Sequence, residues 1–262
     1  MSRQQKVAVV TGASSGIGEA ITRRLAGGGM SVIAVARRAE RLAALAQRDQ
    51  RIVPFPADVT RRTAVAALAD HVAAEHGRCD VLVNNAGIPG GQFRGPDDLD
   101  DVVRTMQVNF MGTVNCIAMF RDLLVASAPS HVINVASVAG KIGSGRPGYA
   151  ASKFATVGFS EALNMAWARD GITITQLNPG LTATEGFPQT QALQSPYARL
   201  VAKPEDVADA VVDVLVRRPR ERTVPRWYRG LVVLRHVVPG PFWAIASRTR
   251  RGQGAAEHPR DR

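Results

Sequence analysis

Short apolar runs alternate along the chain with longer segments in which apolar residues recur at helical spacing. The runs are rich in valine and isoleucine and lack strict apolar–polar alternation, which is typical of strands buried on both faces of a sheet. They predict strands over residues 7–10, 32–36, 52–55, 81–84, 131–135 and 172–177. The helical spacing predicts helices over residues 16–26, 38–46, 61–76, 98–126 (as one or two helices), 149–169 and 204–217.

This alternation of strands and helices predicts an α/β fold with a doubly wound parallel sheet of the Rossmann type. A sheet of this kind binds its ligands outside the carboxyl ends of the strands. No linker interrupts the pattern before about residue 217. We therefore expect one catalytic domain over residues 1–216 and a C-terminal extension over residues 217–262.

Composition is that of an ordinary globular protein, with 45% hydrophobic and 21% charged residues. The two cysteines, Cys79 and Cys116, lie in separate apolar stretches, which argues against a disulfide framework or a zinc site and predicts no metal. The first residues are polar, and no apolar h-region of a signal peptide follows them, so we expect no secretory signal and a cytoplasmic location.

The net charge of +11 is concentrated at the C-terminal end. Twelve arginines and three acidic residues follow residue 216, which leaves the first 216 residues close to neutral. A nearly neutral body excludes nucleic acid as the expected partner of the catalytic domain.

A glycine-rich segment follows the first predicted strand and opens the first predicted helix. Its glycines allow a tight turn and a close approach of the backbone, and the helix N-terminus offers free N–H groups to a pyrophosphate. The alternative is a glycine-rich turn without a ligand. We expect cofactor contacts from Gly12, Ser14, Ser15, Gly16, Ile17 and Gly18.

Two arginines, Arg37 and Arg38, follow the second predicted strand, where an acidic residue would bind the ribose 2′-hydroxyl of NAD. Because a guanidinium pairs well with a phosphate, this position favours NADP(H) over NAD(H). The alternative is that both arginines begin the next helix on a solvated face, as we expect of Arg41. Asp58, with its neighbour Val59, is expected at the adenine; capping of the next helix is the alternative for Asp58.

Tyr149 and Lys153 stand four residues apart, which places a phenol and an ammonium on one face of a helix. A nearby cation favours phenolate, so we expect the pKa of the phenol to fall from about 10 toward neutrality. The spacing alone is weak, since it arises often by chance.

Taken together, the motifs resemble the short-chain dehydrogenase/reductase family over roughly residues 5–216. The matching residues, in the family's order, are Thr11-Gly12-Ala13-Ser14-Ser15-Gly16-Ile17-Gly18, Asn84-Asn85-Ala86-Gly87, Asn109, Ser137, Tyr149-x-x-x-Lys153 and Pro179-Gly180.

The resemblance implies that Tyr149 acts as general acid in carbonyl reduction and as base in alcohol oxidation. Lys153 would lower the pKa of Tyr149 and bind the nicotinamide ribose, and Ser137 would hold the substrate oxygen. Asn109 would anchor a water that links Lys153 to solvent; bonding to backbone in a helix bend is its alternative, and Ser144 is the alternative serine. Further cofactor contacts are implied for Asn85, Ala86, Gly87, Pro179, Gly180, Thr182 and Thr184.

The implied function is hydride transfer between NADP(H) and a carbonyl or alcohol substrate. The segment from about residue 181 to residue 200 is expected to cover a partly apolar ketone or aldehyde, because it contains Phe187, Pro188, Leu193, Pro196 and Tyr197. The alternative is a cofactor-binding redox sensor or scaffold without turnover.

The C-terminal end departs from the family pattern. The glycine and aspartate signals of the usual tetramer contact are missing, so we expect a homo-oligomer, dimer or tetramer, with the tetramer in doubt. Residues 227–262 mix aromatic, apolar and basic side chains, which suits contact with a membrane surface, a lid over the substrate site or packing on the body. Arg235, Pro239 and Pro241 break the stretch too often for it to span a bilayer well.

Overall fold

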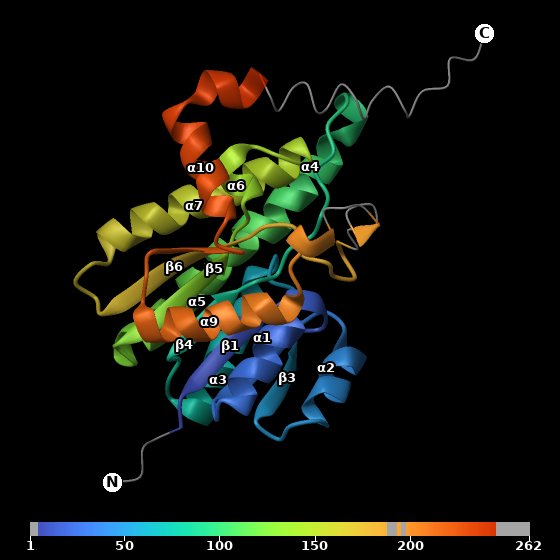
Figure 1. Cartoon of the computed structure of the whole chain (residues 1–262). Helices are drawn as coiled ribbons and strands as arrows, with labels where there is room; N and C mark the ends of the chain where they lie inside the picture. The colour runs from blue at the N-terminus through green and yellow to red at the C-terminus, as the bar shows by residue number, and fades with distance from the viewer. Residues whose placement is uncertain (1–4, 188–192, 195–197, 245–262) are drawn as a thin grey trace.

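The computed structural model describes residues 5–187, 193–194 and 198–244, and this part of the chain forms one seven-stranded sheet flanked by helices (Figure 1). All paired strands are parallel and lie in the order β3-β2-β1-β4-β5-β6-β7. The strands are β1 (Val7–Thr11), β2 (Ser31–Ala36), β3 (Ile52–Pro56), β4 (Val81–Asn84), β5 (Ser130–Val135), β6 (Ile172–Pro179) and β7 (Glu221–Val224). The Rossmann-type α/β fold is thereby confirmed.

Helices lie on both faces of the sheet (Figure 1). The described α-helices are α1 (Gly16–Gly27), α2 (Ala39–Ala46), α3 (Arg62–His76), α4 (Leu99–Met106), α5 (Gly112–Ala126), α6 (Ala139–Ile142), α7 (Pro147–Ala166), α9 (Pro204–Arg217) and α10 (Tyr228–Val237). Shorter helical turns are η1 (Pro96–Asp98), η2 (Gln107–Met111) and η3 (Ala198–Leu200).

Each central strand contributes to two cores because its side chains alternate between the faces. Val10 of β1 packs with α1, α2 and α9, whereas its neighbour Val9 packs with α3 and α5. Both valines are fully buried. This explains why the strands read as continuous apolar runs rather than as alternating ones.

The strand order reverses between β1 and β4, so the loops that follow these two strands diverge from a single point. The hydroxyl of Thr11 joins them: it accepts hydrogen bonds from the backbone N–H groups of Asn85 (3.0 Å) and Ala86 (3.1 Å). This point at the carboxyl edge is where a doubly wound sheet binds its ligand.

Strand β7 was not predicted from the sequence. It pairs with β6 through Gln176 and Glu221 and continues to Pro179 and Val224. Three of its four residues are polar, and the strand is too short to show a strand pattern. The sheet therefore continues past residue 216, beyond the end expected for the catalytic domain.

The segment expected as one or two helices over residues 98–126 is interrupted by η2, a π-helical turn between α4 and α5. Among the described residues, Pro96–Ala126 is the helical stretch long and apolar enough to cross a membrane. Its α5 part instead buries Phe120 and Leu124 against the sheet.

Candidate active site

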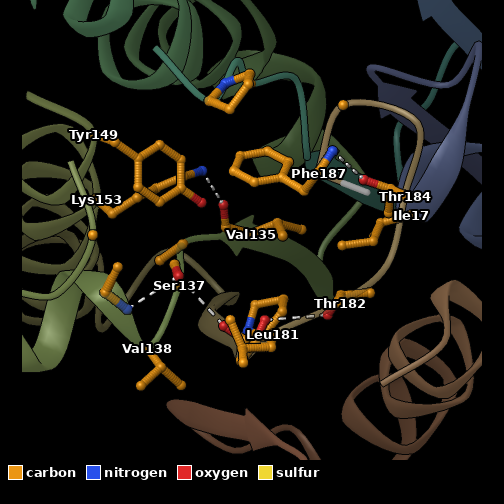
Figure 2. Close-up of a pocket in the computed structure, with 18 of the residues that line it drawn as sticks. Ile17, Val135, Ser137, Val138, Tyr149, Lys153, Leu181, Thr182, Thr184 and Phe187 are labelled. Atoms are coloured by element: carbon orange, nitrogen blue, oxygen red, sulfur yellow. Dashed lines mark hydrogen bonds between the residues drawn. The ribbon is translucent and has the colours of Figure 1, made fainter. Parts of the chain in front are cut away.

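A cavity of about 770 Å³ opens at the carboxyl edge of the sheet and runs from the glycine-rich loop to Tyr149 (Figure 2). The predicted site residues that line it are Gly12, Ser15, Gly16, Ile17, Gly18, Asn85, Gly87, Ser137, Tyr149, Lys153, Pro179, Gly180, Thr182 and Thr184. The structure therefore brings both ends of the predicted site into one space.

The glycine-rich loop forms a cradle that side chains would fill. Gly12 has a φ of +68°, in the region that favours glycine. A Cβ atom on Gly18 would lie 2.2 Å from the carbonyl oxygen of Gly12, so helix α1 approaches the loop as closely as it does only because residue 18 has no side chain. Ser15 is the N-cap of α1, and the first helical residues, from Gly16 to Gly18, line the cavity. The N–H groups of a first helical turn have no partner within the helix and can bind an anion. This arrangement fits the pyrophosphate of a dinucleotide.

The Asn85-Ala86-Gly87 segment braces this loop from β4. The Asn85 side chain donates to the carbonyl oxygen of Thr11 (3.0 Å), and the Ala86 N–H is held by the Thr11 hydroxyl. A Cβ atom on Gly87 would lie 3.3 Å from Asn109 Oδ1 and 3.6 Å from Lys153 Nζ. Gly87 thus leaves room for two polar side chains beside the cavity.

The arginines that follow β2 make different contacts. Arg38 donates to Ser14 Oγ (3.1 and 3.0 Å) and Ser15 Oγ (2.7 Å), which fixes its guanidinium beside the glycine-rich loop. Arg37 is exposed, and its charge acts on Asp58. Arg41, expected on a solvated face, pairs with Glu185 from the distant segment after β6. Arg38 is therefore the arginine best placed for an anion at the loop.

Asp58 makes a local turn. Its Oδ1 accepts from the backbone N–H (2.9 Å) and the hydroxyl (2.8 Å) of Thr60. Burial alone would raise the pKa of the Asp58 carboxyl, but the Thr60 hydrogen bonds and the charge of Arg37 hold it below the usual value. Helix α3 begins at Arg62 with Arg61 as its N-cap and has no side-chain cap, so Asp58 closes a turn before the helix and does not cap it. Val59 packs its side chain in the core.

Tyr149 and Lys153 lie on helix α7 and face the cavity, as their spacing predicts (Figure 2). Lys153 is 4% exposed, and its Nζ donates to the carbonyl oxygen of Val135 at the end of β5 (2.9 Å). The same Nζ lies 5.8 Å from the centroid of the Tyr149 ring. The helix thus presents the phenol and the ammonium together.

The expected fall of the Tyr149 pKa is not found. Burial raises the pKa of Tyr149, and the Ser137 hydroxyl opposes this only in part. Burial also lowers the pKa of Lys153 to about 8. Desolvation therefore sets the direction of both pKa shifts, and the hydrogen bond of the Lys153 ammonium goes to the Val135 carbonyl oxygen.

Ser137 follows β5 and lies across the cavity from the glycine-rich loop (Figure 2). Its Oγ accepts from the Ala139 N–H (3.1 Å) and makes a long hydrogen bond to the Pro179 carbonyl oxygen (3.4 Å). The second serine considered, Ser144, also lines the cavity. Only Ser137 acts on the pKa of Tyr149, which favours it as the serine paired with the phenol.

Asn109 lies in the π-helical turn η2 and is 1% exposed. Its Oδ1 accepts from the Ile88 N–H (2.8 Å), and its Nδ2 donates to the Ile88 carbonyl oxygen (3.1 Å) and to Ser152 Oγ (3.1 Å). The amide therefore ties the segment after β4 to α7, as the backbone-bonding alternative predicted. π-helical turns occur frequently at functional sites, where they redirect a side chain.

The segment after β6 closes the cavity. Pro179, Gly180, Thr182 and Thr184 line it, and Phe187 places its ring 5.5 Å from that of Tyr149 (Figure 2). Of the apolar residues predicted in this segment, Pro188, Pro196 and Tyr197 lie outside the described residues.

Sequence reasoning missed Tyr228 as a site residue. It begins helix α10 and lines the cavity, and its hydroxyl accepts from the Leu181 N–H (3.3 Å). A Cβ atom on Gly180 would lie 2.0 Å from the Tyr228 ring. The pairing of a glycine at the end of β6 with an aromatic residue near the C-terminus leaves no local sequence signal.

Of the predicted residues, those that do not line the cavity are Ser14, Arg37, Arg38, Asp58, Val59, Ala86 and Asn109.

A glycine cradle at the switch point of a doubly wound sheet, in one cavity with a half-buried tyrosine and a buried lysine, defines a nucleotide-binding oxidoreductase. A family model for short chain dehydrogenase matches residues 6–194. The chain is 33% identical over 222 residues to a fatty acyl-CoA reductase of Acinetobacter baylyi, a match that covers 82% of this chain and 74% of that protein. It is 35% identical over 227 residues to a farnesol dehydrogenase of Aedes aegypti, covering 82% and 91%.

Another relative, the glycine betaine reductase ATRR of Emericella nidulans, is 34% identical over 225 residues, but this chain spans only 18% of its length. Among solved structures, a short-chain dehydrogenase/reductase from Burkholderia phymatum in complex with NAD has a TM-score of 0.79 at 25% identity, covering 90% of this chain and 94% of that one. A variant of the actinorhodin polyketide ketoreductase with NADPH has a TM-score of 0.76 at 27% identity, covering 86% and 97%.

This chain belongs to the short-chain dehydrogenase/reductase family. It is an oxidoreductase of that family, acts on alcohol or carbonyl groups and uses a nicotinamide cofactor.

Proposed function

We propose that this protein is an NADP(H)-dependent carbonyl reductase that acts on a partly apolar ketone or aldehyde. One observation carries the proposal: a single cavity joins the glycine cradle to Ser137, Tyr149 and Lys153. A binding-only sensor or scaffold, the alternative, has no need of a proton donor and an oxygen-binding hydroxyl in the same space.

In this proposal the substrate carbonyl lies between Ser137 and Tyr149, and the cofactor supplies the hydride that reduces it. The Ser137 hydroxyl donates a hydrogen bond to the substrate oxygen, on which negative charge develops. Tyr149 protonates that oxygen. Because burial raises the pKa of Tyr149, the phenol is protonated at neutral pH and can act as an acid. The Lys153 ammonium then stabilises the phenolate that remains.

The preference for NADP(H) is supported by Arg38, whose guanidinium is fixed beside Ser14 and Ser15. No acidic residue stands at the end of β2, where Arg37 and Arg38 follow Ala36. Solved relatives occur with both cofactors, NAD in one and NADPH in another.

An apolar substrate is supported by the cavity wall near Tyr149, which includes Ile142, Leu181, Phe187 and Tyr228. Two relatives, a fatty acyl-CoA reductase and a farnesol dehydrogenase, are named for compounds that carry hydrocarbon chains. We therefore propose a carbonyl or alcohol attached to a hydrocarbon chain as the substrate class.

The test is the absorbance of NADPH during incubation with long-chain and short-chain aldehydes and ketones, with NADH in parallel. We expect turnover with NADPH that increases with chain length. Tyr149→Phe should lower kcat by about a thousandfold or more, because it removes the proton donor, while the Kd for NADPH stays within about twofold. Tyr228→Phe keeps the cavity wall and serves as the matched control. Turnover retained in Tyr149→Phe would contradict the role of Tyr149, and NADPH binding without turnover on any substrate would favour the sensor.

We further propose a cytoplasmic protein that touches a membrane surface through residues 227–262. The described part of this stretch supports contact: Val233, Val237 and Trp243 are exposed, and Arg229 and Arg235 lie among them. No acidic residue occurs between Glu221 and Glu257 in the sequence.

A homo-oligomer, either a dimer or a tetramer, is proposed as well. Helix α4 supports it, because Leu99 and Val103 are each more than half exposed on its surface. Light scattering during size-exclusion chromatography is the test, and a monomer at micromolar concentration would contradict it.

A further inference from the structure

Glu185 ties the segment after β6 to the arginines at the end of β2. Its Oε1 accepts from Arg38 Nη1 (3.1 Å), and its Oε2 accepts from Arg41. One carboxylate therefore bridges two guanidinium groups that come from a part of the chain almost 150 residues away. Together these interactions hold the pKa of Glu185 below its usual value, the hydrogen bond from Arg41 contributing most.

The same arginine reaches the glycine-rich loop. Arg38 also donates to Ser14 Oγ and Ser15 Oγ, so the Glu185 carboxylate lies next to the loop that fits the cofactor phosphates. A carboxylate and a phosphate are both oxyanions that a guanidinium binds through charge-assisted hydrogen bonds. Glu185 thus provides, within the chain, the kind of charge that a cofactor phosphate would bring.

Glu185 also fixes a turn that reaches the catalytic end of the cavity. The Thr184 N–H donates to the Phe187 carbonyl oxygen (2.9 Å), and the Phe187 N–H donates back to the Thr184 carbonyl oxygen (3.1 Å). On one side of this turn Thr184 packs over Gly16, where a Cβ atom would lie 3.0 Å from the threonine side chain. On the other side the Phe187 ring lies beside Tyr149. The ion pairs of Glu185 therefore hold a segment that covers both the phosphate cradle and the phenol.

We propose that Glu185 is a specificity-determining residue: in the cofactor-free protein it occupies the anion site formed by Arg38 and Arg41, and the 2′-phosphate of NADP(H) competes with it for that site. This inference rests on the proposed preference for NADP(H). The 2′-phosphate displaces the carboxylate and frees the turn that carries Phe187, whereas NAD(H), which lacks this phosphate, leaves the ion pairs in place.

We expect the Glu185 carboxylate to weaken phosphate binding only modestly, because all three charged groups are partly exposed. The side chains of Arg38, Arg41 and Glu185 are 38%, 44% and 54% exposed, so water and salt screen the ion pairs. Exposed pairs of this kind change an equilibrium constant by a factor of roughly two to five each. The carboxylate therefore weakens phosphate binding without preventing it.

The first experiment measures the binding of two cofactor fragments, 2′,5′-ADP and 5′-AMP, by isothermal titration calorimetry at low ionic strength. We expect Glu185→Gln to bind 2′,5′-ADP about two- to tenfold more tightly than the natural chain does, by the ion-pair factors above, with 5′-AMP unchanged within about twofold. Glu75→Gln is the matched control, because it removes one exposed glutamate from α3, and it should change neither affinity.

The second experiment follows amide hydrogen exchange at Thr184 and Phe187. In the natural chain 2′,5′-ADP should accelerate exchange at both amides, and 5′-AMP should not. In Glu185→Gln both amides should exchange faster before any ligand is added, because the turn has lost its anchor.

The outcomes separate the two proposals. Unchanged or weaker binding of 2′,5′-ADP by Glu185→Gln would overturn the role of Glu185, even if the natural chain prefers 2′,5′-ADP over 5′-AMP. A natural chain without that preference would contradict the choice of NADP(H). If Glu185→Gln then gained the preference, competition by the carboxylate would be upheld and the cofactor proposal alone would fail.

Discussion

Lys153 is buried, with 4% of its surface exposed. Burial of its ammonium lowers the free energy of unfolding by an amount that depends on pH. Its pKa falls from 10.5 to about 8 on folding because burial disfavours the charged form. Between those values the unfolded chain holds a proton that the folded chain has released, so the contribution of Lys153 to stability rises with pH across this window. Below about pH 8 the cost is complete and on the order of 3 kcal/mol.

Replacement of Lys153 by methionine should therefore stabilise the protein at pH 7. We expect a free energy of unfolding higher by roughly 1–3 kcal/mol, with the gain shrinking toward pH 10.5. Urea unfolding at a series of pH values measures the difference between the variant and the natural chain. Lys6→Met, which removes an exposed lysine, is the control. A gain of the same size at every pH would show that burial of the charge is not its cause.

For single residues, the sequence predicts which side chains share a helix face but not how the fold shifts their pKa values. The spacing of Tyr149 and Lys153 was enough to place both on one face of a helix, because the helical period fixes that geometry. The direction of the pKa shifts was not predictable, since it depends on how deeply the surrounding elements bury each group. Likewise, two adjacent arginines look alike in the sequence, and only the turn of the backbone after β2 sends Arg38 to the serines and leaves Arg37 exposed.

At the scale of elements, the contact between β6 and α10 depends on a missing side chain. Gly180 follows the last residue of β6, and the Tyr228 ring occupies the place where a Cβ atom would lie. Gly180→Ala should therefore lower the free energy of unfolding by about 1–3 kcal/mol, as overpacking does. The loss should be smaller when Tyr228 is also replaced by alanine, because the clash is then absent.

Chemical unfolding of the two single variants and the double variant completes this cycle. Gly158→Ala is a suitable control, because a Cβ atom there meets nothing within 4 Å. Equal losses from Gly180→Ala in both backgrounds would show that the tyrosine is not what the new methyl group strikes.

Most helices and strands could be predicted from the sequence, because a helix buried on one side and a strand buried on both sides each have a recognisable apolar pattern. Strands β1, β2, β4, β5 and β6 are short apolar runs because both of their faces are covered. Strand β7 was not predicted because it lies at the edge of the sheet and begins with Glu221 and Arg222, whose charges suit an exposed edge. The place of Tyr228 in the site was not predicted for a different reason. Its partners, Gly180 and Leu181, are far away in sequence, and no spacing rule connects them with Tyr228.

At the scale of the whole molecule, the proposed membrane contact lies next to the cavity. Helix α10 begins at Tyr228, a cavity residue, and continues to the exposed Val233 and Val237. Helix α10 lies near α6 and α7 in Figure 1. An apolar substrate dissolved in a bilayer would therefore be delivered close to the opening of the site.

Vesicle sedimentation checks this prediction. The natural chain should bind vesicles that contain anionic phosphatidylglycerol more strongly than neutral ones. Val233→Glu with Val237→Glu should lower the partition coefficient by about tenfold or more, since each charge near an anionic surface contributes about 1 kcal/mol. Val216→Glu, at an exposed valine on α9, is the matched control. Equal binding by the double variant and the natural chain would remove the membrane proposal.

Trp227 stacks on Tyr228 with ring centroids 3.7 Å apart and an angle of 24° between the planes. The indole therefore touches a ring that itself lines the cavity. Occupation of the cavity should alter the emission of this indole, and the change should remain when Trp167 and Trp243 are replaced by phenylalanine. The protein would then report its own ligand binding by intrinsic fluorescence, without an added dye and before any substrate has been identified.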